Sequence, residues 1–337
     1  MRSYFLLVCL AVQSLMAQEP LPVVKPPLVF NPKNPHVHDP VMIKEKGVYY
    51  VFGTGKGISK LYSKDLKTWT EGKPVFDKVP EWTKTALPGF DGDIWAPDII
   101  FHQGQFHLFY ACNATPGKPN AAIGHATTPT LDPKDPRFKW TDHGKIIQSI
   151  LGRDTWQAID GTVFIDNGTA WLIFGSFWDG IKAVKLTPDL MQLKWPEEWH
   201  TIARRPSQQK PYNYGLEDSQ IEGAFVYKHG DYYYLFASFD MCCRGINSNY
   251  HVVVGRSKSI TGPYLDKAGY DMIDGNGTDF AIGDGKQYAA LGHNSVYRID
   301  GKDLFVAHAY SIPDDGDSKL VVWELEWDAQ GWPILKR

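Results

Sequence analysis

The feature that most constrains the fold of this chain is a motif that recurs in one register. In each of four copies a polar residue is followed by an apolar run, a glycine eight positions later, and a second apolar or aromatic run. The four polar residues are Asp39, Asp160, Glu222 and His293. A fifth copy places Ala96 eight positions before Gly104. Each copy predicts two β-strands joined by a tight turn, because apolar and aromatic runs favour strands and glycine favours turns.

The five copies follow one another at a mean spacing of about 64 residues. Four-stranded units repeated at such a spacing are typical of β-propellers. We therefore predict an all-β fold, a five-bladed β-propeller. It should form a single domain over residues 18–337, since no Ser/Gly-rich linker or charged tract divides the chain. A β-sandwich with accidental internal similarity is the alternative.

The N-terminal residues 1–17 have the pattern of a secretory signal peptide. Arg2 supplies the positive start, Phe5–Val12 the apolar run, and Ala17 a small residue before cleavage. The alternative is an anchor helix, but the run is too short to span a bilayer. We expect a secreted protein, extracellular or periplasmic, without a membrane partner. The formal net charge of -3 also argues against nucleic acid as a dominant partner.

Three cysteines remain after residue 17, namely Cys112, Cys242 and Cys243. An odd number cannot form a complete disulfide framework. No CxxC motif or nearby histidine completes a tetrahedral metal site. We expect buried free thiols, with one disulfide to Cys112 as the alternative.

The inner strand of each propeller blade lines the central channel, so equivalent residues should form a ring. That ring is predicted to contain Asp39, Ala96, Asp160, Glu222 and His293. Carboxylates gathered in a narrow channel raise each other's pKa, an arrangement found mainly at functional sites. Carboxylates whose pKa values differ can divide the acid and base roles of glycosidic bond hydrolysis. A turn or cap role for each residue is the alternative.

Aromatic residues near the same strand ends could stack on sugar rings or simply pack between blades. They are Trp95, Trp156, Phe177 and Trp178. His293 could be hydrogen-bonded, or could bind a cation that screens the acidic ring. Calcium would need water to complete its shell, because it prefers oxygen ligands.

The sequence resembles glycoside hydrolase family 43, and within it the endo-1,5-α-L-arabinanases, from about Val37 to Trp327. The motifs that carry the resemblance are His38-Asp39-Pro40, Trp95-Ala96-Pro97-Asp98, Ala121–Ala126, Ala158-Ile159-Asp160, Gly175–Asp179, Ile221-Glu222-Gly223, Cys242-Cys243-Arg244-Gly245 and Gly292–Ser295. The resemblance implies a five-bladed propeller that cleaves internal 1,5-α-L-arabinofuranosidic bonds of arabinan or arabino-oligosaccharides with inversion of configuration.

By the same resemblance, Asp39 is the general base, Glu222 the general acid, and Asp160 the carboxylate that keeps the acid protonated. An inverting pair should lie roughly 6.5–9.5 Å apart to leave room for water. His293 matches a histidine that holds an axial, mostly water-ligated calcium ion. The positions that match the family's sugar groove are Gly124, Gln157, Ser176, Phe177 and Trp178.

Two residues depart from the family pattern beside Asp160, where Gln157 replaces the common Asn and Gly161 the common Pro. The fine specificity of the groove therefore stays open. An exo-acting α-L-arabinofuranosidase or β-xylosidase is the close alternative, since loops decide whether the groove is closed at one end. A non-catalytic sugar-binding propeller would need the aromatic residues but not the carboxylates. A protein-interaction propeller would not need the acidic ring.

Overall fold

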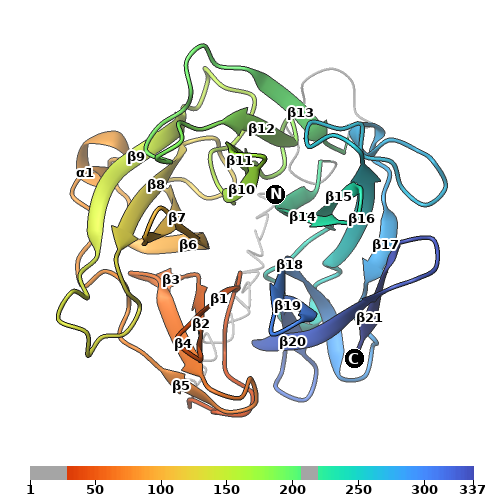
Figure 1. The fold of residues 1–337 in the computed structure, drawn as a ribbon, viewed down its shortest axis with the longest axis horizontal. Coiled ribbons are helices and arrows are strands. Elements are labelled where there is room, and N and C mark those ends of the chain that lie inside the picture. Colours follow the sequence, from red (N-terminus) through yellow and green to blue (C-terminus); the bar gives the residue numbers. More distant parts are fainter. Residues whose placement is uncertain (1–28, 206–218) are drawn as a thin grey trace, which may run out of the picture.

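The computed structural model describes residues 29–205 and 219–337, which form five antiparallel sheets around a central axis (Figure 1). The predicted five-bladed, all-β propeller is confirmed. The predicted signal peptide, residues 1–17, lies outside the described residues. No helix within the described ranges is long and apolar enough to cross a membrane.

Each blade is built from strands that follow one another in sequence. Blade 1 contains β1 (Val41–Glu45), β2 (Val48–Gly53), β4 (Ser59–Ser63) and β5 (Trp69–Glu71). Blade 2 contains β6 (Asp93–His102), β7 (Gln105–Asn113), β8 (Ala121–Thr128) and β9 (Thr141–Ser149), with the short β3 (Gly55–Lys56) paired to β6. Blade 3 contains β10 (Thr162–Asp166), β11 (Thr169–Phe174), β12 (Ile181–Lys185) and β13 (Trp199–Ala203).

The last two blades have the same four-stranded order. Blade 4 contains β14 (Ile221–His229), β15 (Tyr232–Phe239), β16 (His251–Ser257) and β17 (Thr278–Ala281). Blade 5 contains β18 (Tyr288–Ile299), β19 (Lys302–Ser311), β20 (Asp317–Trp327) and β21 (Pro333–Lys336). The described helices are short connections, namely α1 (Thr83–Ala86), η1 (Gly245–Asn247) and η2 (Met272–Asp274).

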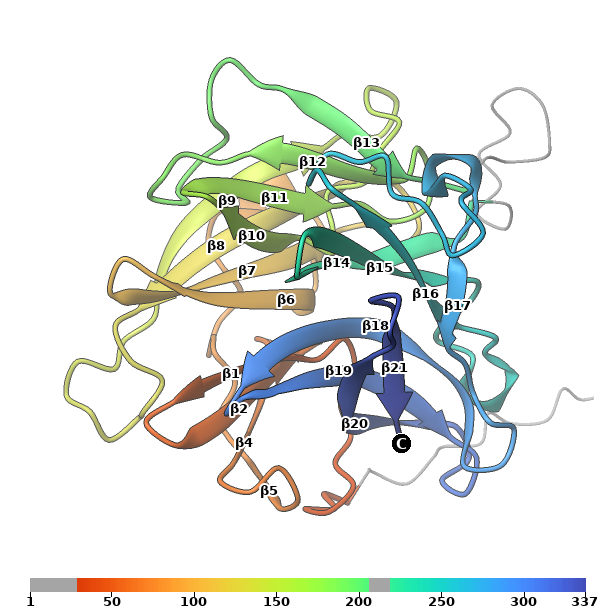
Figure 2. The same ribbon diagram turned by 45° about the vertical axis from the view of Figure 1, so that its right-hand side comes forward.

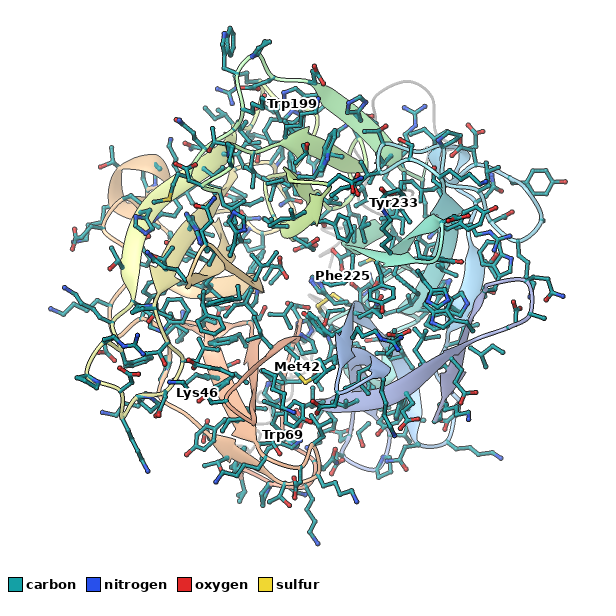
Figure 3. The ribbon with its side chains drawn as sticks, viewed as in Figure 1. Met42, Lys46, Trp69, Trp199, Phe225 and Tyr233 are labelled. Carbon is teal, nitrogen blue, oxygen red and sulfur yellow. A yellow bond between two sulfur atoms is a disulfide. The ribbon has the colours of Figure 1, made fainter. Side chains whose placement is uncertain are left out.

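The hydrophobic core lies between neighbouring blades. In the cluster between blades 5 and 1, for example, Val51 and Leu61 share buried contacts with Leu304 and Val306. Equivalent clusters join blades 1 and 2, blades 2 and 3, blades 3 and 4, and blades 4 and 5. Side chains on both faces of each sheet are therefore buried, with Met42 of β1 nearer the axis than Trp69 of β5 (Figure 3).

The ring closes where the first blade meets the last, and Figure 2 shows β1 and β2 beside β18 and β19. Residues just before blade 1 pair with β20, since Val37 N–H donates to Ser318 O and Leu320 N–H donates to Pro35 O, both at 3.1 Å. Blade 5 takes all four of its strands from the C-terminal part of the chain. Closure therefore uses a short added pairing rather than a strand shared between the first and last blades.

Candidate active site

The inner strand of each blade is joined to the next strand by a two-residue loop. In blades 1, 2, 3 and 5 both loop residues have positive φ, as in Lys46-Gly47, which twists the hairpin in the sense that antiparallel strands need. In blade 4 the loop is Gly230-Asp231, so its glycine is the first loop residue and not the second. Counting back from the glycine therefore shifts the predicted register of this blade by one residue.

The prediction that Glu222 occupies the same ring position as Asp39 was wrong by this one residue. Five structurally equivalent residues share a positive φ between 39° and 56°, and they are Asp39, Ala96, Asp160, Gly223 and His293. The β-bulges give the same alignment of the blades. Trp95, Glu222 and Gly292 are each the last residue paired with the neighbouring strand before a bulge, and one of the five equivalent residues directly follows each of them. Left-handed backbone at non-glycine residues is uncommon and marks positions that the surrounding structure holds in place.

Asp39 is buried and surrounded by imidazoles. Its Oδ1 lies 2.9 Å from Nδ1 of His38, 3.1 Å from Nδ1 of His293 and 3.5 Å from Nδ1 of His308. Burial alone would raise the pKa of Asp39, but the neighbouring histidines outweigh burial and hold this pKa well below its usual value. Thr54 also donates its hydroxyl to Asp39 Oδ2 at 2.5 Å. Asp39 is therefore ionised at neutral pH.

Asp160 and Glu222 have the opposite electrostatic character. Burial, Glu222 and Asp39 raise the pKa of Asp160 well above its usual value, although Asp160 Oδ2 accepts the Gly223 N–H at 3.2 Å. Loss of surrounding water also raises the pKa of Glu222, against the opposing effects of His293 and Ser176. The site thus combines one carboxylate that is readily ionised with two that hold protons more tightly, the division needed for acid–base catalysis.

A family model described as "Glycosyl hydrolases family 43" matches residues 31–333 of the chain. The chain belongs to glycosyl hydrolase family 43. It is 46% identical to the extracellular exo-α-(1→5)-L-arabinofuranosidase of Cellvibrio japonicus, an alignment covering 89% of this chain and 86% of that protein. It is 38% identical to the extracellular endo-α-(1→5)-L-arabinanase 1 of Bacillus subtilis, covering 89% and 88% of the two chains.

Among solved structures, the fold resembles that of a Cellvibrio cellulosa α-L-arabinanase complexed with arabinohexaose. The TM-score is 0.85 at 45% identity, and the match covers 90% of this chain and 96% of that one. The propeller is thus that of a family 43 member over nearly the whole described chain.

Most residues predicted to line the sugar groove of this family 43 protein lie beside the carboxylates or on segments leading to them. Ser176 donates its hydroxyl to Glu222 Oε2 at 2.8 Å. Phe177 N–H donates to Ile221 O at 2.7 Å, and this hydrogen bond holds the segment against β14. Phe177 and Trp178 both have positive φ. Gln157 is buried three residues before Asp160 and donates from Nε2 to Lys118 O at 3.0 Å.

Trp95 and Trp156 differ in their surroundings, and so in whether they suit stacking on a sugar ring or packing between blades. Trp95 is half-buried at the axial end of its strand and donates from Nε1 to Asp93 Oδ2 at 3.2 Å. Trp156 packs edge-on against Phe174 and tilted against Trp199, so it belongs to the blade core.

Gly124 does not have the surroundings of a groove residue. It is buried in β8 opposite Tyr110, and a Cβ atom at this position would lie 2.4 Å from Cζ of that ring. We therefore correct the prediction that Gly124 lines the sugar groove. The absence of a side chain here serves to admit Tyr110 between blades 1 and 2.

The expectation of free cysteines was wrong for two of the three. Cys242 and Cys243 form a disulfide with each other, while Cys112 is a buried free thiol, so the alternative bond to Cys112 is also wrong. The adjacent cysteines lie in a loop and not in the core, and Cys243 is exposed. The Cys243 sulfur lies 3.8 Å from Nε2 of His38, which places the disulfide beside the histidines that surround Asp39.

Several residues of the site were not predicted from sequence. His308 comes to Asp39 through the pairing of β19 with β18, and its ring stacks on His38 with centroids 3.9 Å apart. Tyr310 lies two residues along β19 and contacts Nε2 of His38 at 2.9 Å. His38 itself was part of a quoted motif without a role. The period-two alternation of His308 and Tyr310 was the available signal, but it does not say which face they share.

The resemblance predicts that His293 holds calcium. Its Nδ1 faces Asp39, so Nε2 is the ring atom that could bind an ion. Among the described residues, the two sets of three ligand groups that lie close enough to share an ion both centre on His38 and exclude His293. Calcium takes six to eight oxygen ligands. These residues therefore fit an ion held by one imidazole and otherwise by water, and do not fit a calcium site made of protein oxygens.

Proposed function

We propose that this family 43 protein hydrolyses 1,5-α-L-arabinofuranosidic bonds with inversion of configuration. The observation that carries the proposal is the axial arrangement of one low-pKa carboxylate, Asp39, with two carboxylates of raised pKa, Asp160 and Glu222. The names of the relatives supply the substrate class, since the similar proteins are termed arabinanases or arabinofuranosidases.

In the proposed reaction, Asp39 takes a proton from a water molecule as the water oxygen attacks the anomeric carbon. The bond from that carbon to the leaving oxygen breaks, and Glu222 gives its proton to this oxygen. The histidines around Asp39 Oδ1 keep the base ionised before reaction. The negative charge of Asp39 favours the protonated form of Glu222, and Asp160 and Glu222, both of raised pKa, compete for protons within the site.

Two candidate functions differ in where the arabinan chain is cleaved, at its end or at internal bonds. Removal of arabinose units from a chain end is favoured by similarity, because the relative named as exo-acting is 46% identical and the one named as endo-acting is 38% identical. Internal cleavage is favoured by the resemblance to the endo-1,5-α-L-arabinanases, to which the Cys242-Cys243-Arg244-Gly245 motif contributes. We place chain-end attack first and keep internal cleavage as the second candidate.

Two further properties belong to this proposal. The pattern of residues 1–17 and the extracellular relatives support secretion. The Nε2 atom of His293 supports a mostly water-ligated axial calcium ion, whose positive charge would screen the acidic residues. The reaction described above uses only the side chains of the chain itself.

A product profile on linear 1,5-α-L-arabinan, followed over time by chromatography, tests the function. Short products of a single size from the first minutes would support chain-end attack. A mixture of oligosaccharides at early times would support internal cleavage. No product, with arabinan still bound, would refute the hydrolase proposal in favour of a sugar-binding propeller.

A further inference from the structure

A pocket lies on the outside of the propeller, away from the axial carboxylates. It has a volume of about 1060 Å³ and is bounded by β2, β4 and β5 of blade 1, by the chain after β5, and by the loop between β8 and β9 of blade 2. Lys46, labelled in Figure 3, lies on its rim. That residue is in the hairpin loop at the opposite end of β1 from Asp39. The pocket and the axial site share no residue among those described.

Lys60 is a buried cation in the wall of this pocket, with only 6% of its surface exposed. Along β4, Leu61 points into the core between blades 1 and 5, while Lys60 and Tyr62 line the pocket. Gly72 makes room for the lysine, because a Cβ atom there would lie 2.6 Å from Lys60 Cε. The glycine thus allows a long side chain to lie flat in the wall.

The ammonium group of Lys60 has no hydrogen-bond or ion-pair partner within the described ranges 29–205 and 219–337. Its described contact is with the ring of Phe138, whose centroid lies 5.3 Å from Nζ. Burial lowers the pKa of Lys60, and no described carboxylate offsets this effect. Lys60 Nζ is not among the fully buried polar atoms that lack a partner, so the ammonium group reaches the pocket, where a ligand could pair with it.

We propose that this pocket binds a sugar acid, namely a uronate unit of a polysaccharide, with its carboxylate on Lys60. The aromatic side chains of the wall, Phe138, Trp140 and Tyr62, suit the apolar face of a sugar ring. The volume lies just above the usual range for small-molecule sites and far exceeds that of an inorganic anion. Five lysines line the pocket together with the carboxylates of Glu45, Asp65, Glu71, Asp77 and Asp132. The site would hold an acidic polysaccharide while leaving the axial carboxylates free.

Binding of tri-galacturonate to the full chain, measured by calorimetry, tests this proposal. Wild-type protein should bind it saturably, and Lys60→Met should weaken binding about tenfold to a hundredfold, the usual loss for a hydrogen bond to a charged group. Met preserves the length of the aliphatic stem and removes the buried charge, so the variant should fold. Lys302→Met, which alters an exposed lysine of blade 5 paired with Glu324, is the matched control and should bind normally.

Two further measurements separate this site from the axial one and from other ligands. Glu222→Gln should bind tri-galacturonate as well as the wild type, since Glu222 does not line the pocket. Tyr62→Ala, at the pocket rim, should weaken binding without touching the buried lysine and serves if Lys60→Met is unstable. Absence of saturable binding, unchanged binding in Lys60→Met, or equally tight binding of neutral arabinotriose or of inorganic phosphate would each overturn the proposal.

Discussion

The hydroxyl of Ser176 should set the alkaline limit of activity, because it donates to Glu222 Oε2 at 2.8 Å. This hydrogen bond favours the ionised form of Glu222 and so lowers its pKa. A hydrogen bond to a charged group contributes about 1.5–3 kcal/mol. One pKa unit corresponds to about 1.4 kcal/mol, and Glu222 is half-buried, so we take the lower end and expect Ser176→Ala to raise the Glu222 pKa by about one unit.

The sign follows from the proposed role of Glu222. A general acid must be protonated, so activity falls as pH rises through its pKa. In Ser176→Ala the alkaline limb of kcat/KM against pH should move upward by about one unit, while the acid limb stays in place. Ser63→Ala removes a hydroxyl that donates to Asp65 in blade 1 at 3.0 Å, and its pH profile should match the wild type.

A simple loss of activity at all pH values, with both limbs unmoved, would show that Ser176 positions substrate and does not tune the acid. A downward shift of the alkaline limb would refute the assignment of Glu222 as the proton donor. A rise in KM without any change in the limbs would also place Ser176 in the groove only, as the family resemblance alone implies.

Three other predictions concern stability, the base and the metal. Burial raises the pKa of Asp98 to about 7, so this residue increasingly destabilises the folded state as the pH rises from about 4 to 7. Asp98→Asn can still accept the Val163 N–H and should raise the melting temperature at pH 8 but not at pH 4. An equal drop in melting temperature at both pH values would refute this prediction. Asp39→Asn should abolish turnover yet still bind arabino-oligosaccharides in calorimetry; retained turnover would remove Asp39 as the base. Exhaustive chelation should lower the melting temperature and activity of the wild type but not the melting temperature of His293→Ala; a chelated, metal-free wild type with both unchanged would refute a role for calcium.

The fold could be predicted from sequence because each blade repeats the same short pattern of strand, glycine turn and strand. The register of blade 4 could not, because Gly230 is the first residue of its loop, whereas Gly47, Gly104, Gly168 and Gly301 are second in theirs. A glycine can supply positive φ at either loop position. Turn composition alone therefore leaves an uncertainty of one residue, which was enough to misplace Glu222 relative to the ring.

The sequence predicted that Asp39 and Asp160 lie at equivalent positions just before the inner strands, because they share one place in the repeat. One residue that lowers the pKa of Asp39 was not predictable, since His308 reaches Asp39 only through the pairing of β18 with β19 and the closure of the ring. The role of Gly124 was mistaken because a motif match gives position in the chain and not the neighbour across the strand, which is Tyr110. The same limit applies to Cys242 and Cys243, whose bond depends on loop conformation.

The most direct test of the proposed chemistry is the configuration of the first sugar released from 1,5-α-L-arabinan, followed by proton NMR before mutarotation. A base and an acid acting on opposite faces of the sugar ring require a single displacement. We predict that the first product carries the β configuration at its new reducing end and that Glu222→Gln releases it at least about 10²-fold more slowly. Release of the α anomer first would mean a covalent intermediate on the enzyme, and would contradict the roles assigned to Asp39 and Glu222.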